Sequence, residues 1–386
     1  MNQPKHSRQP GEANRKRAIE RGLAFVYRTA CDRANFEAYG YDYLCCFHCI
    51  ASTSKDLNLR RLARKMGQER ALRWRREHSQ VPATADADAI AYLVFGSYAA
   101  DKLGIRDPGL KKQLREVAGR FSAEDYLAFN AATEAPPDDV PEECECCTDN
   151  PRGRKACRSC RKRLTMMSRY GVWLDALITS YMGERYGVRL GAGFADVIKW
   201  LPMMRPYPKY DDGNNPDFWW AIYAVTHVVY TLNDYSSYSL SPDCLPQEYA
   251  FLKRNLQYAI RMEDSETMGE FLDTLKSFGL SEDHPLIVKG VTYLLSQQNP
   301  DGSWGDSGVE DIYERYHPTW TAIDGLREYR RLGQRLSLPG LNSTGEERPA
   351  SKQTKAADRK MKSGRASLPT LPANSASRKR RRSSPG

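Results

Sequence analysis

The chain has 386 residues, of which 40% are hydrophobic and 27% are charged, so it is long enough for one large domain or two ordinary ones. It contains no run of about 18 apolar residues, so we expect no transmembrane helix. The polar, basic first segment, MNQPKHSRQPGEANRKR, leads into no apolar stretch, which argues against a secretory signal. These features predict an intracellular protein, either cytoplasmic or, in a eukaryote, nuclear.

The net charge of +10 is concentrated at the two ends of the chain. Residues 1–80 contain 17 Lys and Arg against 8 Asp and Glu, and residues 341–386 contain 12 against 3. The middle of the chain is therefore acidic. Basic ends can attract nucleic acid or an anionic surface, although they can equally serve as solvated tails that keep a protein soluble.

The first part of the chain divides into two segments. Residues 1–16 are predicted to be a disordered basic N-terminus. Residues 17–133 are predicted to be helical, because apolar side chains recur every three or four residues through Tyr41–Ile50, Leu57–Trp74 and Asp86–Leu103. The sequence Cys45-Cys46-Phe47-His48-Cys49 falls in this pattern, and we interpret it as a buried helical face, with a second metal site or a reactive thiol as the alternative.

Residues 134–163 interrupt the helical pattern with prolines and a group of cysteines. Cys144, Cys147, Cys157 and Cys160 have the spacing Cys-x2-Cys-x9-Cys-x2-Cys. Two pairs of thiolates, each pair separated by two residues, can complete a tetrahedral site around one ion. We therefore predict a zinc knuckle with a structural zinc ion, and disulfides are less favoured in the absence of a secretory signal.

Residues 164–335 return to a helical pattern, and residues 336–386 form a disordered basic tail by composition. Proline and glycine breaks predict helices at about 216–234, 246–261, 265–279, 284–298 and 318–332. The tail carries a basic run that is a candidate nuclear-import signal in a eukaryote. Its residues are Arg378, Lys379, Arg380, Arg381 and Arg382.

The segment Lys289–Trp304 reads KGVTYLLSQQNPDGSW, with Gln298, Gly302 and Trp304 at spaced positions. It resembles the QW motif of squalene-hopene and oxidosqualene cyclases. The following YHPTWTAIDGL at 316–326 resembles an inner helix of protein prenyltransferase β subunits, in which the histidine matching His317 is a zinc ligand. The resemblance implies an all-α protein, an α/α toroid of stacked helical hairpins around a central cavity, with residues 164–335 as toroid repeats. Residues 17–133 are either divergent repeats of the same toroid or a separate helical domain.

The expected inner helices carry a set of side chains suited to metal chemistry. His227 lies in the middle of one, Glu270 lies on the next, and His317 and Asp324 lie seven residues apart on the last. Two histidines facing one cavity, with one or two carboxylates, suit zinc or non-haem iron with open coordination positions. The sequence predicts His227 and His317 as metal ligands and Glu270 and Asp324 as catalytic groups. The alternative is that both histidines are core residues and that Asp324 has a structural role.

Two functions follow as expectations. The first is a terpene cyclase-like or prenyltransferase-like enzyme that binds a hydrophobic or isoprenoid-like small molecule in the cavity and depends on zinc or iron. The prenyltransferase Asp-x-Cys ligand pair is missing from the expected helix, which argues against farnesyl transfer itself. The second is a binding module, in which the basic ends and the cysteine segment dock nucleic acid or a protein and the toroid is a scaffold.

Overall fold

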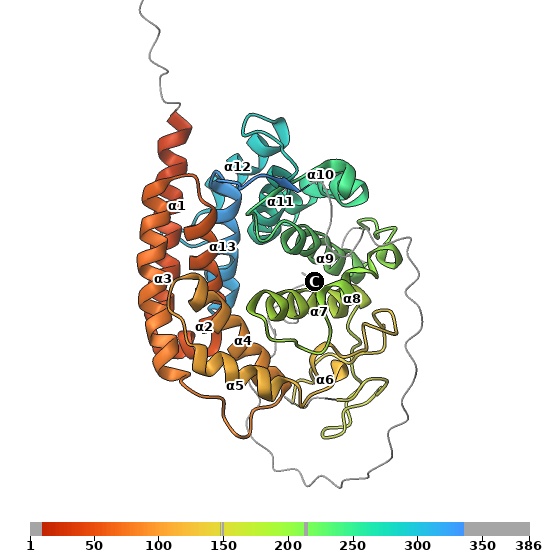
Figure 1. Cartoon of the computed structure of the whole chain (residues 1–386). Coiled ribbons are helices and arrows are strands. Elements are labelled where there is room, and N and C mark those ends of the chain that lie inside the picture. Colours follow the sequence, from red (N-terminus) through yellow and green to blue (C-terminus); the bar gives the residue numbers. More distant parts are fainter. Residues whose placement is uncertain (1–9, 147, 149, 212–214, 336–386) are drawn as a thin grey trace, which may run out of the picture.

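The computed structural model describes residues 10–335 except 147, 149 and 212–214 (Figure 1). The all-α prediction is confirmed for these residues, which form thirteen α-helices. Two short strands, β1 (Ser239–Leu240) and β2 (Gln334–Arg335), pair in parallel. No helix in the described residues combines the length and the apolar character needed to cross a membrane.

Six helices contact one another in a closed cycle, each one touching the next and the last touching the first (Figure 1). In the order of their contacts they are α2 (Arg33–Thr53), α4 (Ala87–Lys102), α7 (Arg169–Tyr186), α9 (Pro216–Leu232), α11 (Ser265–Ser277) and α13 (Tyr313–Leu326). This order is also the order of the chain. The first two members come from the region 17–133, so the N-terminal and C-terminal parts share one hydrophobic core.

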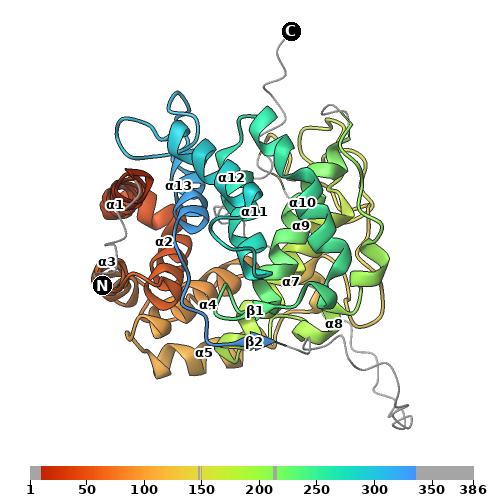
Figure 2. The ribbon, with the colours of Figure 1, turned by 90° about the horizontal axis from the view of Figure 1, so that it is seen from above.

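The other helices pack on the outside of these six (Figure 2). They are α1 (Pro10–Cys31), α3 (Leu57–Glu77), α5 (Pro108–Ala118), α6 (Ala123–Leu127), α8 (Phe194–Ile198), α10 (Pro246–Arg261) and α12 (Pro285–Gln297). Two short 3-10 turns lie at Leu201–Met204 and Pro242–Cys244. Along most of the chain an outer helix therefore alternates with one of the six.

Local sequence signals explain where most helices begin. The Asp56, Asp86 and Asp264 side chains each accept a hydrogen bond from a backbone N–H in the first turn of α3, α4 and α11. Proline occupies the first turn of α5, α9, α10 and α12, where its missing N–H costs no helical hydrogen bond. The predicted helices at 246–261, 265–279 and 284–298 therefore agree with the observed ones within about two residues.

Two boundaries differ from the sequence prediction. Residues 10–16 were assigned to a disordered segment, but they begin α1, where Arg15 pairs with Glu282 at 2.8 Å. The last helix is α13 at 313–326 rather than 318–332, because Pro318 lies inside the helix and the chain becomes extended at Arg327. The basic run 378–382 and the rest of the 336–386 tail lie outside the described residues.

The predicted QW segment connects the last two described helices to the outer helix α1. The Gln298 amide donates to the carbonyl oxygens of Ala18 in α1, at 2.9 Å, and of Gly302, at 3.0 Å. Gly302 has a φ of +96°, and a Cβ there would lie 2.7 Å from the Arg21 carbonyl oxygen, so both conformation and space require glycine. Trp304 is fully buried and donates its indole N–H to the Leu294 carbonyl at 2.8 Å. These three residues thus fasten the α12–α13 connection onto α1.

Helices α11 and α13 pack together closely because glycine faces the contact on both sides. A Cβ on Gly269 would lie 2.3 Å from the Thr321 carbonyl oxygen, and one on Gly325 would lie 2.9 Å from the Gly269 Cα. Both obstacles are backbone atoms, which cannot rotate away as a side chain can. This close approach brings the side chains of α11 next to those of α13 in the site described below.

We expect Gly269→Ala to lower the free energy of unfolding by about 1–3 kcal/mol or more, because α11 must move away from α13. Gly119→Ala is the matched control, since a Cβ there meets nothing within 4 Å. Denaturant titration of both variants measures the difference. Equal stabilities would contradict the packing described here.

Candidate functional site

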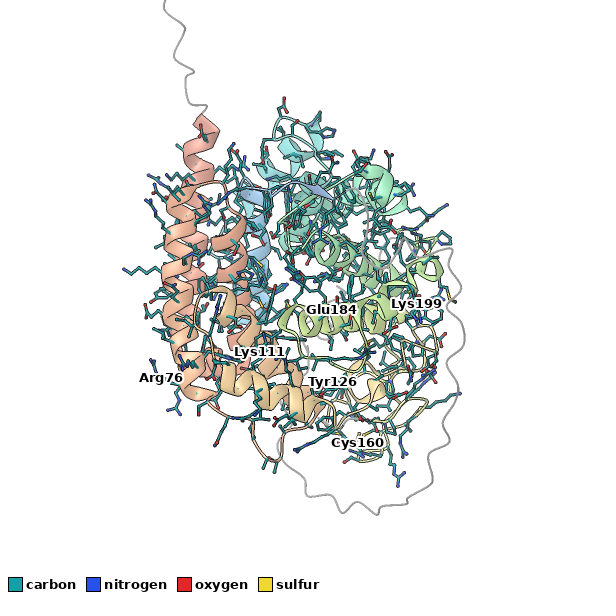
Figure 3. All side chains as sticks on the ribbon, in the orientation of Figure 1. Arg76, Lys111, Tyr126, Cys160, Glu184 and Lys199 are labelled. Carbon is teal, nitrogen blue, oxygen red and sulfur yellow. The ribbon has the colours of Figure 1, made fainter. Side chains whose placement is uncertain are left out.

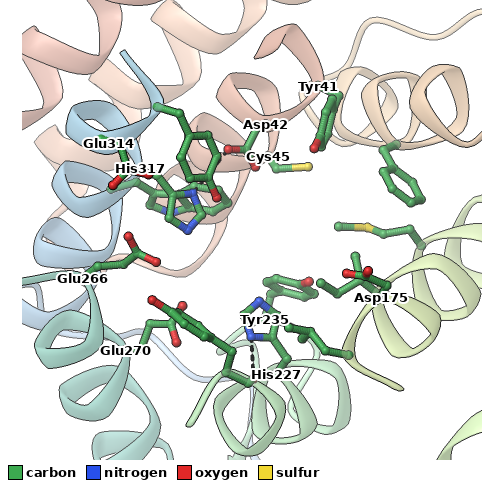
Figure 4. A pocket seen from close by; sticks show the side chains of 17 residues that line it. Tyr41, Asp42, Cys45, Asp175, His227, Tyr235, Glu266, Glu270, Glu314 and His317 are labelled. Carbon is green, nitrogen blue, oxygen red and sulfur yellow. Dashed lines mark hydrogen bonds and ion pairs between the residues drawn. The ribbon is translucent and has the colours of Figure 1, made fainter. Parts of the chain in front are cut away.

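A cavity of about 130 Å³ lies inside the cycle and is lined by side chains from all six of its helices (Figure 4). Aromatic and aliphatic residues form much of its wall. Five carboxylates and two histidines also line it, and none of the lysines and arginines that the structure describes does so. These carboxylates and histidines are Asp42, Asp175, Glu266, Glu270, Glu314, His227 and His317. Such a wall is electronegative, and a cation would complement it.

Three of these side chains converge closely enough to hold one metal ion. Glu266 and Glu270 are one turn apart on α11 and therefore point from the same face. His317 reaches them from α13, and one ligand atom of each residue lies within 4.8 Å of the others. Figure 4 shows the three on the same side of the cavity. Two carboxylates and an imidazole that leave other positions open are a donor set suited to zinc or iron(II).

Asp42 of α2 orients the His317 ring. His317 Nδ1 lies 3.4 Å from Asp42 Oδ2, and the Tyr316 hydroxyl donates to the same oxygen at 2.8 Å. With Nδ1 turned to Asp42, Nε2 is the nitrogen left for an ion, as in the carboxylate–histidine–metal arrangements of metalloenzymes. Burial lowers the pKa of His317, but the hydrogen bond to Asp42 and the charges of Glu266, Asp42 and Glu270 raise it overall to about 9.

Glu270 is buried and is held by one neutral donor. The Thr226 hydroxyl of α9 donates to Glu270 Oε2 at 2.7 Å. Desolvation, together with the nearby charge of Glu266, raises the pKa of Glu270 to about 8. Without a cation, Glu270 therefore carries a proton at neutral pH. In this state it can act as an acid, and it must lose the proton to become a metal ligand.

His227 lines the same cavity from α9 but is not part of the three-residue cluster. Its Nδ1 lies 2.9 Å from the Tyr223 carbonyl oxygen, so Nδ1 carries the proton and Nε2 the lone pair. Burial lowers the pKa of His227 to about 4. The ring is therefore neutral, so it can serve either as a base or as a further ligand.

Asp324 is placed elsewhere. It is not among the residues that line the cavity, and its Oδ1 accepts from Arg327 Nε at 2.6 Å. Arg327 also donates to the Ser54 hydroxyl of the N-terminal region, at 3.2 Å. This buried ion pair matches the structural alternative stated for Asp324, and we leave Asp324 out of the candidate site.

A tight turn after α9 brings Tyr235 into the cavity wall. Asp234, Tyr235 and Ser236 all have positive φ, at 58°, 47° and 64°. Non-glycine residues rarely adopt this conformation, and surrounding contacts must hold it. The Asn233 side chain accepts from the Ser236 N–H at 2.7 Å, and the Ser236 hydroxyl donates to Asp273 at 2.7 Å. The strained turn therefore positions a ring at the site.

The sequence patterns indicate Glu270, His227 and His317, but they do not indicate the other four carboxylates of the cavity wall, Asp42, Asp175, Glu266 and Glu314. The spacing of Glu266 and Glu270 was the one available signal, since two carboxylates four residues apart share a helix face. Asp42 had no such signal, because it meets His317 across 275 residues of sequence.

The cysteine cluster forms a second candidate metal centre. Cys144, Cys146, Cys157 and Cys160 lie close together, with sulfur–sulfur distances of 3.4 Å for Cys144–Cys160 and 3.6 Å for Cys146–Cys157. They could bind a metal ion such as zinc. The fourth cysteine is Cys146, while the predicted ligand Cys147 lies outside the described residues.

The two groups of cysteines differ in their thiol chemistry. Desolvation opposes ionisation of Cys157, but the backbone N–H groups of Cys160 and Ser159 outweigh it and lower the pKa of Cys157 to about 5. Burial instead raises the pKa of the Cys45, Cys46 and Cys49 thiols on α2 far above its usual value. This agrees with the prediction that residues 45–49 form a buried face.

Binding of a divalent cation at the three-residue cluster is expected to strengthen as pH rises. Glu270, with a pKa of about 8, and His317, with a pKa of about 9, must both lose a proton to become ligands. The affinity should rise by up to about 100-fold per pH unit below pH 8, by about tenfold per unit from 8 to 9, and then level off. Calorimetry with Zn²⁺ in buffers of different ionisation enthalpy would count the released protons. An affinity that is flat between pH 6 and pH 9 would contradict this assignment.

Asp42→Asn is expected to weaken cation binding at the cluster by about 10–100-fold, because the His317 ring loses its charged partner. The same change should lower the pKa of His317, so the pH at which affinity levels off moves downward. Tyr316→Phe is the matched control, since it removes the other hydrogen bond to Asp42 and leaves the carboxylate in place. If both variants lose the same cation affinity, the loss would come from disturbed packing around Asp42 and not from the orientation of the His317 ring.

Comparison of the chain with protein-family models, with curated proteins and with solved structures found no match. The resemblance of residues 289–304 and 316–326 to toroid enzymes therefore stays a prediction.

Proposed function

We propose that the described helices form an α/α toroid, with the closed cycle of six as its inner ring and the alternating outer helices as its second layer. The order of the contacts supports this, because each inner helix touches its neighbours in the sequence of the chain. In this proposal residues 17–133 belong to the toroid, since α2 and α4 supply two of the six inner helices. The fastening of the QW segment onto α1 would then join the last outer helix, α12, to the first.

We propose that the protein is a metal-dependent enzyme whose reaction centre is Glu266, Glu270 and His317. The single observation that carries this is the convergence of two buried carboxylates and one histidine within 4.8 Å in a cavity. Zinc or iron(II) there supplies a Lewis acid with coordination positions open to substrate or water. Burying several ionisable side chains without a bound cation lowers the stability of the fold. Such clusters are common at sites where a bound ligand offsets this loss.

The residues of the chain have separate tasks in this proposal. Asp42 holds the proton of His317 at Nδ1, and Thr226 fixes one oxygen of Glu270 by its hydroxyl proton. His227 stays neutral with Nε2 as acceptor and serves as the general base. Burial of these groups among the rings of the cavity lowers the local dielectric, so their charges are less screened than at the surface.

The substrate we propose is hydrophobic or isoprenoid-like, as the sequence resemblance implies. The lining supports it through six aromatic side chains, whose faces can stabilise developing positive charge. They are Tyr41, Phe95, Tyr223, Tyr235, Tyr313 and Trp320. The electronegative wall favours a substrate or intermediate that gains positive charge during the reaction.

A second candidate function uses Glu270 as a proton donor without a metal. The observation that favours it is the protonated state of Glu270 at neutral pH, in a cavity with aromatic walls. A carboxylic acid in such a setting can protonate an alkene and start a cyclisation. The two candidates differ in one measurable property, which is whether the cavity holds an ion.

We propose that the cysteine cluster binds structural zinc, separately from the cavity. Among the described residues, its hydrophobic cluster consists of Cys144, Cys157 and Leu164 with Met166 packed against them, which is too little apolar surface to order this segment. The alternative function as a nucleic-acid-binding or protein-binding module would use this segment and the basic ends. Most of the charge in the ends lies beyond the described residues or on the outer helices α1 and α3.

The test is metal content by plasma mass spectrometry on the full chain and on two variants. We expect two ions per chain in the wild type, loss of one in His317→Ala, and loss of the other in Cys157→Ser. A wild-type content of one ion that only the cysteine variant loses would refute the cavity metal and favour the proton-donor candidate. Circular dichroism of His317→Ala would show that the helices are retained.

A further inference from the structure

Helix α3 is an outer helix whose large apolar side chains do not all face the core. The side chains that it buries against its neighbours are mostly small. They are Leu59, Ala63, Gly67, Ala71 and Trp74. Leu57, Leu62 and Leu72 are instead 47%, 39% and 45% exposed. Leu57 and Leu72 are fifteen residues apart, close to four whole turns, so they project from the same side.

The same exposed side is strongly basic. Three of its exposed basic residues fall between Leu57 and Leu72 and two follow Leu72, while the exposed Glu69 in the same stretch pairs with Arg70. These exposed basic residues are Arg61, Arg64, Lys65, Arg75 and Arg76. Arg75 lies 3.6 Å from Asp107, whereas in the described part of the chain no acidic side chain forms an ion pair with the other four. Figure 3 shows Arg76 at the outer edge of the molecule.

The other arginines of α3 behave differently. Arg70 lies over the Tyr27 ring of α1, and Arg73 lies over the Phe36 ring of α2. Arg73 also pairs with Glu77 at 2.8 Å. Arg70 and Arg73 therefore help to pack α3 against α1 and α2. The five exposed basic residues make no such contact with a ring that the structure describes, so they can bind a partner.

We propose that this outer face of α3 docks on an anionic lipid surface. Leucines between arginines and a lysine allow the apolar side chains to enter the boundary between headgroups and acyl chains while the basic groups reach the phosphates. Nucleic acid fits less well, because single strands are bound by aromatic rings and duplexes by polar side chains, and exposed leucines serve neither. The docking would be peripheral and parallel to the helix.

The experiment is vesicle co-sedimentation of the full chain. The probes are vesicles of phosphatidylcholine alone and of phosphatidylcholine mixed with phosphatidylglycerol. We expect binding to the mixed vesicles only, and a loss of at least about 100-fold in the variant Arg61→Glu, Arg64→Glu, Lys65→Glu, since each basic group contributes about fivefold. The matched control reverses Lys253, Arg254 and Arg261 on the outer helix α10, which are also exposed, and should bind as the wild type does.

A second variant, Leu57→Ser with Leu72→Ser, keeps the charge and tests the apolar part of the face. We expect it to weaken binding to mixed vesicles several-fold. The binding that remains should be electrostatic and should disappear at high salt concentration. Equal losses in the α3 and α10 reversals would overturn the proposal, because binding would then follow the overall charge of the protein rather than this face. Unchanged binding in the α3 reversal would overturn it as well, because charge elsewhere in the chain would then explain the binding. A loss of duplex DNA or RNA binding in the α3 reversal, with vesicle binding and the leucine variant unaffected, would also overturn it and indicate a nucleic-acid surface.

Discussion

Replacing Glu270 by glutamine is expected to stabilise the metal-free protein and at the same time to weaken its binding of Zn²⁺ or Fe²⁺. The pKa of Glu270 is raised from 4.5 to about 8, so the folded state binds more protons than the unfolded state between these pH values. Stability is therefore lost as pH rises from 4.5 to 8, and the loss amounts to about 3 kcal/mol at pH 7. Glutamine removes this loss because it does not ionise, and its amide oxygen can still accept from Thr226.

The same substitution removes a ligand, so the affinity for the cation should fall by about 100-fold or more. Denaturant titration of the metal-free protein and calorimetry with Zn²⁺ measure the two effects separately. Glu116→Gln on the exposed side of α5 is the matched control and should change neither. Unchanged cation affinity in Glu270→Gln would exclude Glu270 as a ligand. A loss of stability in the metal-free variant would contradict the raised pKa of Glu270.

Removing the cysteine cluster is expected to open the segment around it without unfolding the helices. Replacing Cys157 and Cys160 together by serine, or adding a chelator, should raise the rate of tryptic cleavage at Arg152–Arg161 by at least about 100-fold. The reason is that the small apolar cluster cannot replace the free energy of metal binding, which is about 10 kcal/mol or more in small zinc domains. Cys31→Ser, at an exposed cysteine outside the cluster, is the matched control.

The serine variants Cys146→Ser and Cys147→Ser separate the ligand set seen in the structure from the set predicted by spacing. We expect Cys146→Ser to lose the zinc ion and Cys147→Ser to keep it. The opposite result would support Cys144 and Cys147, the Cys-x2-Cys pair predicted from the sequence, as the ligands. Cleavage that stays slow in both the double serine variant and the chelated protein would contradict a structural role for the ion.

Interactions over short stretches of sequence account for what could be predicted. The helices at 246–261 and 265–277 begin after a proline or a capping aspartate and show the apolar spacing of one buried face. The cysteine group was visible because ligand pairs on a turn are close in sequence. His317 and Glu270 stood out as polar groups in helices expected to be inner ones.

Contacts between distant segments could not be predicted in this way. Nothing near Asp42 in the sequence indicates that it meets His317, and nothing near Asp324 shows that Arg327 turns back to pair with it. Pro318 was expected to begin a helix, but its position inside α13 depends on how residues 313–317 pack. These outcomes depend on which helices become neighbours.

By itself the sequence determined an all-α chain, the start of most helices, the cysteine-rich segment and three of the side chains that line the cavity. It could do so because capping, helical periodicity and turn formation depend on residues within a few positions of one another. Only the tertiary structure decided that Glu266 joins Glu270 and His317, that Asp42 orients the histidine, and that Asp324 stays outside. The physical reason is that these pairings are set by the approach of separate helices, such as the glycine contact between α11 and α13, in which burial and backbone contact outweigh local preference.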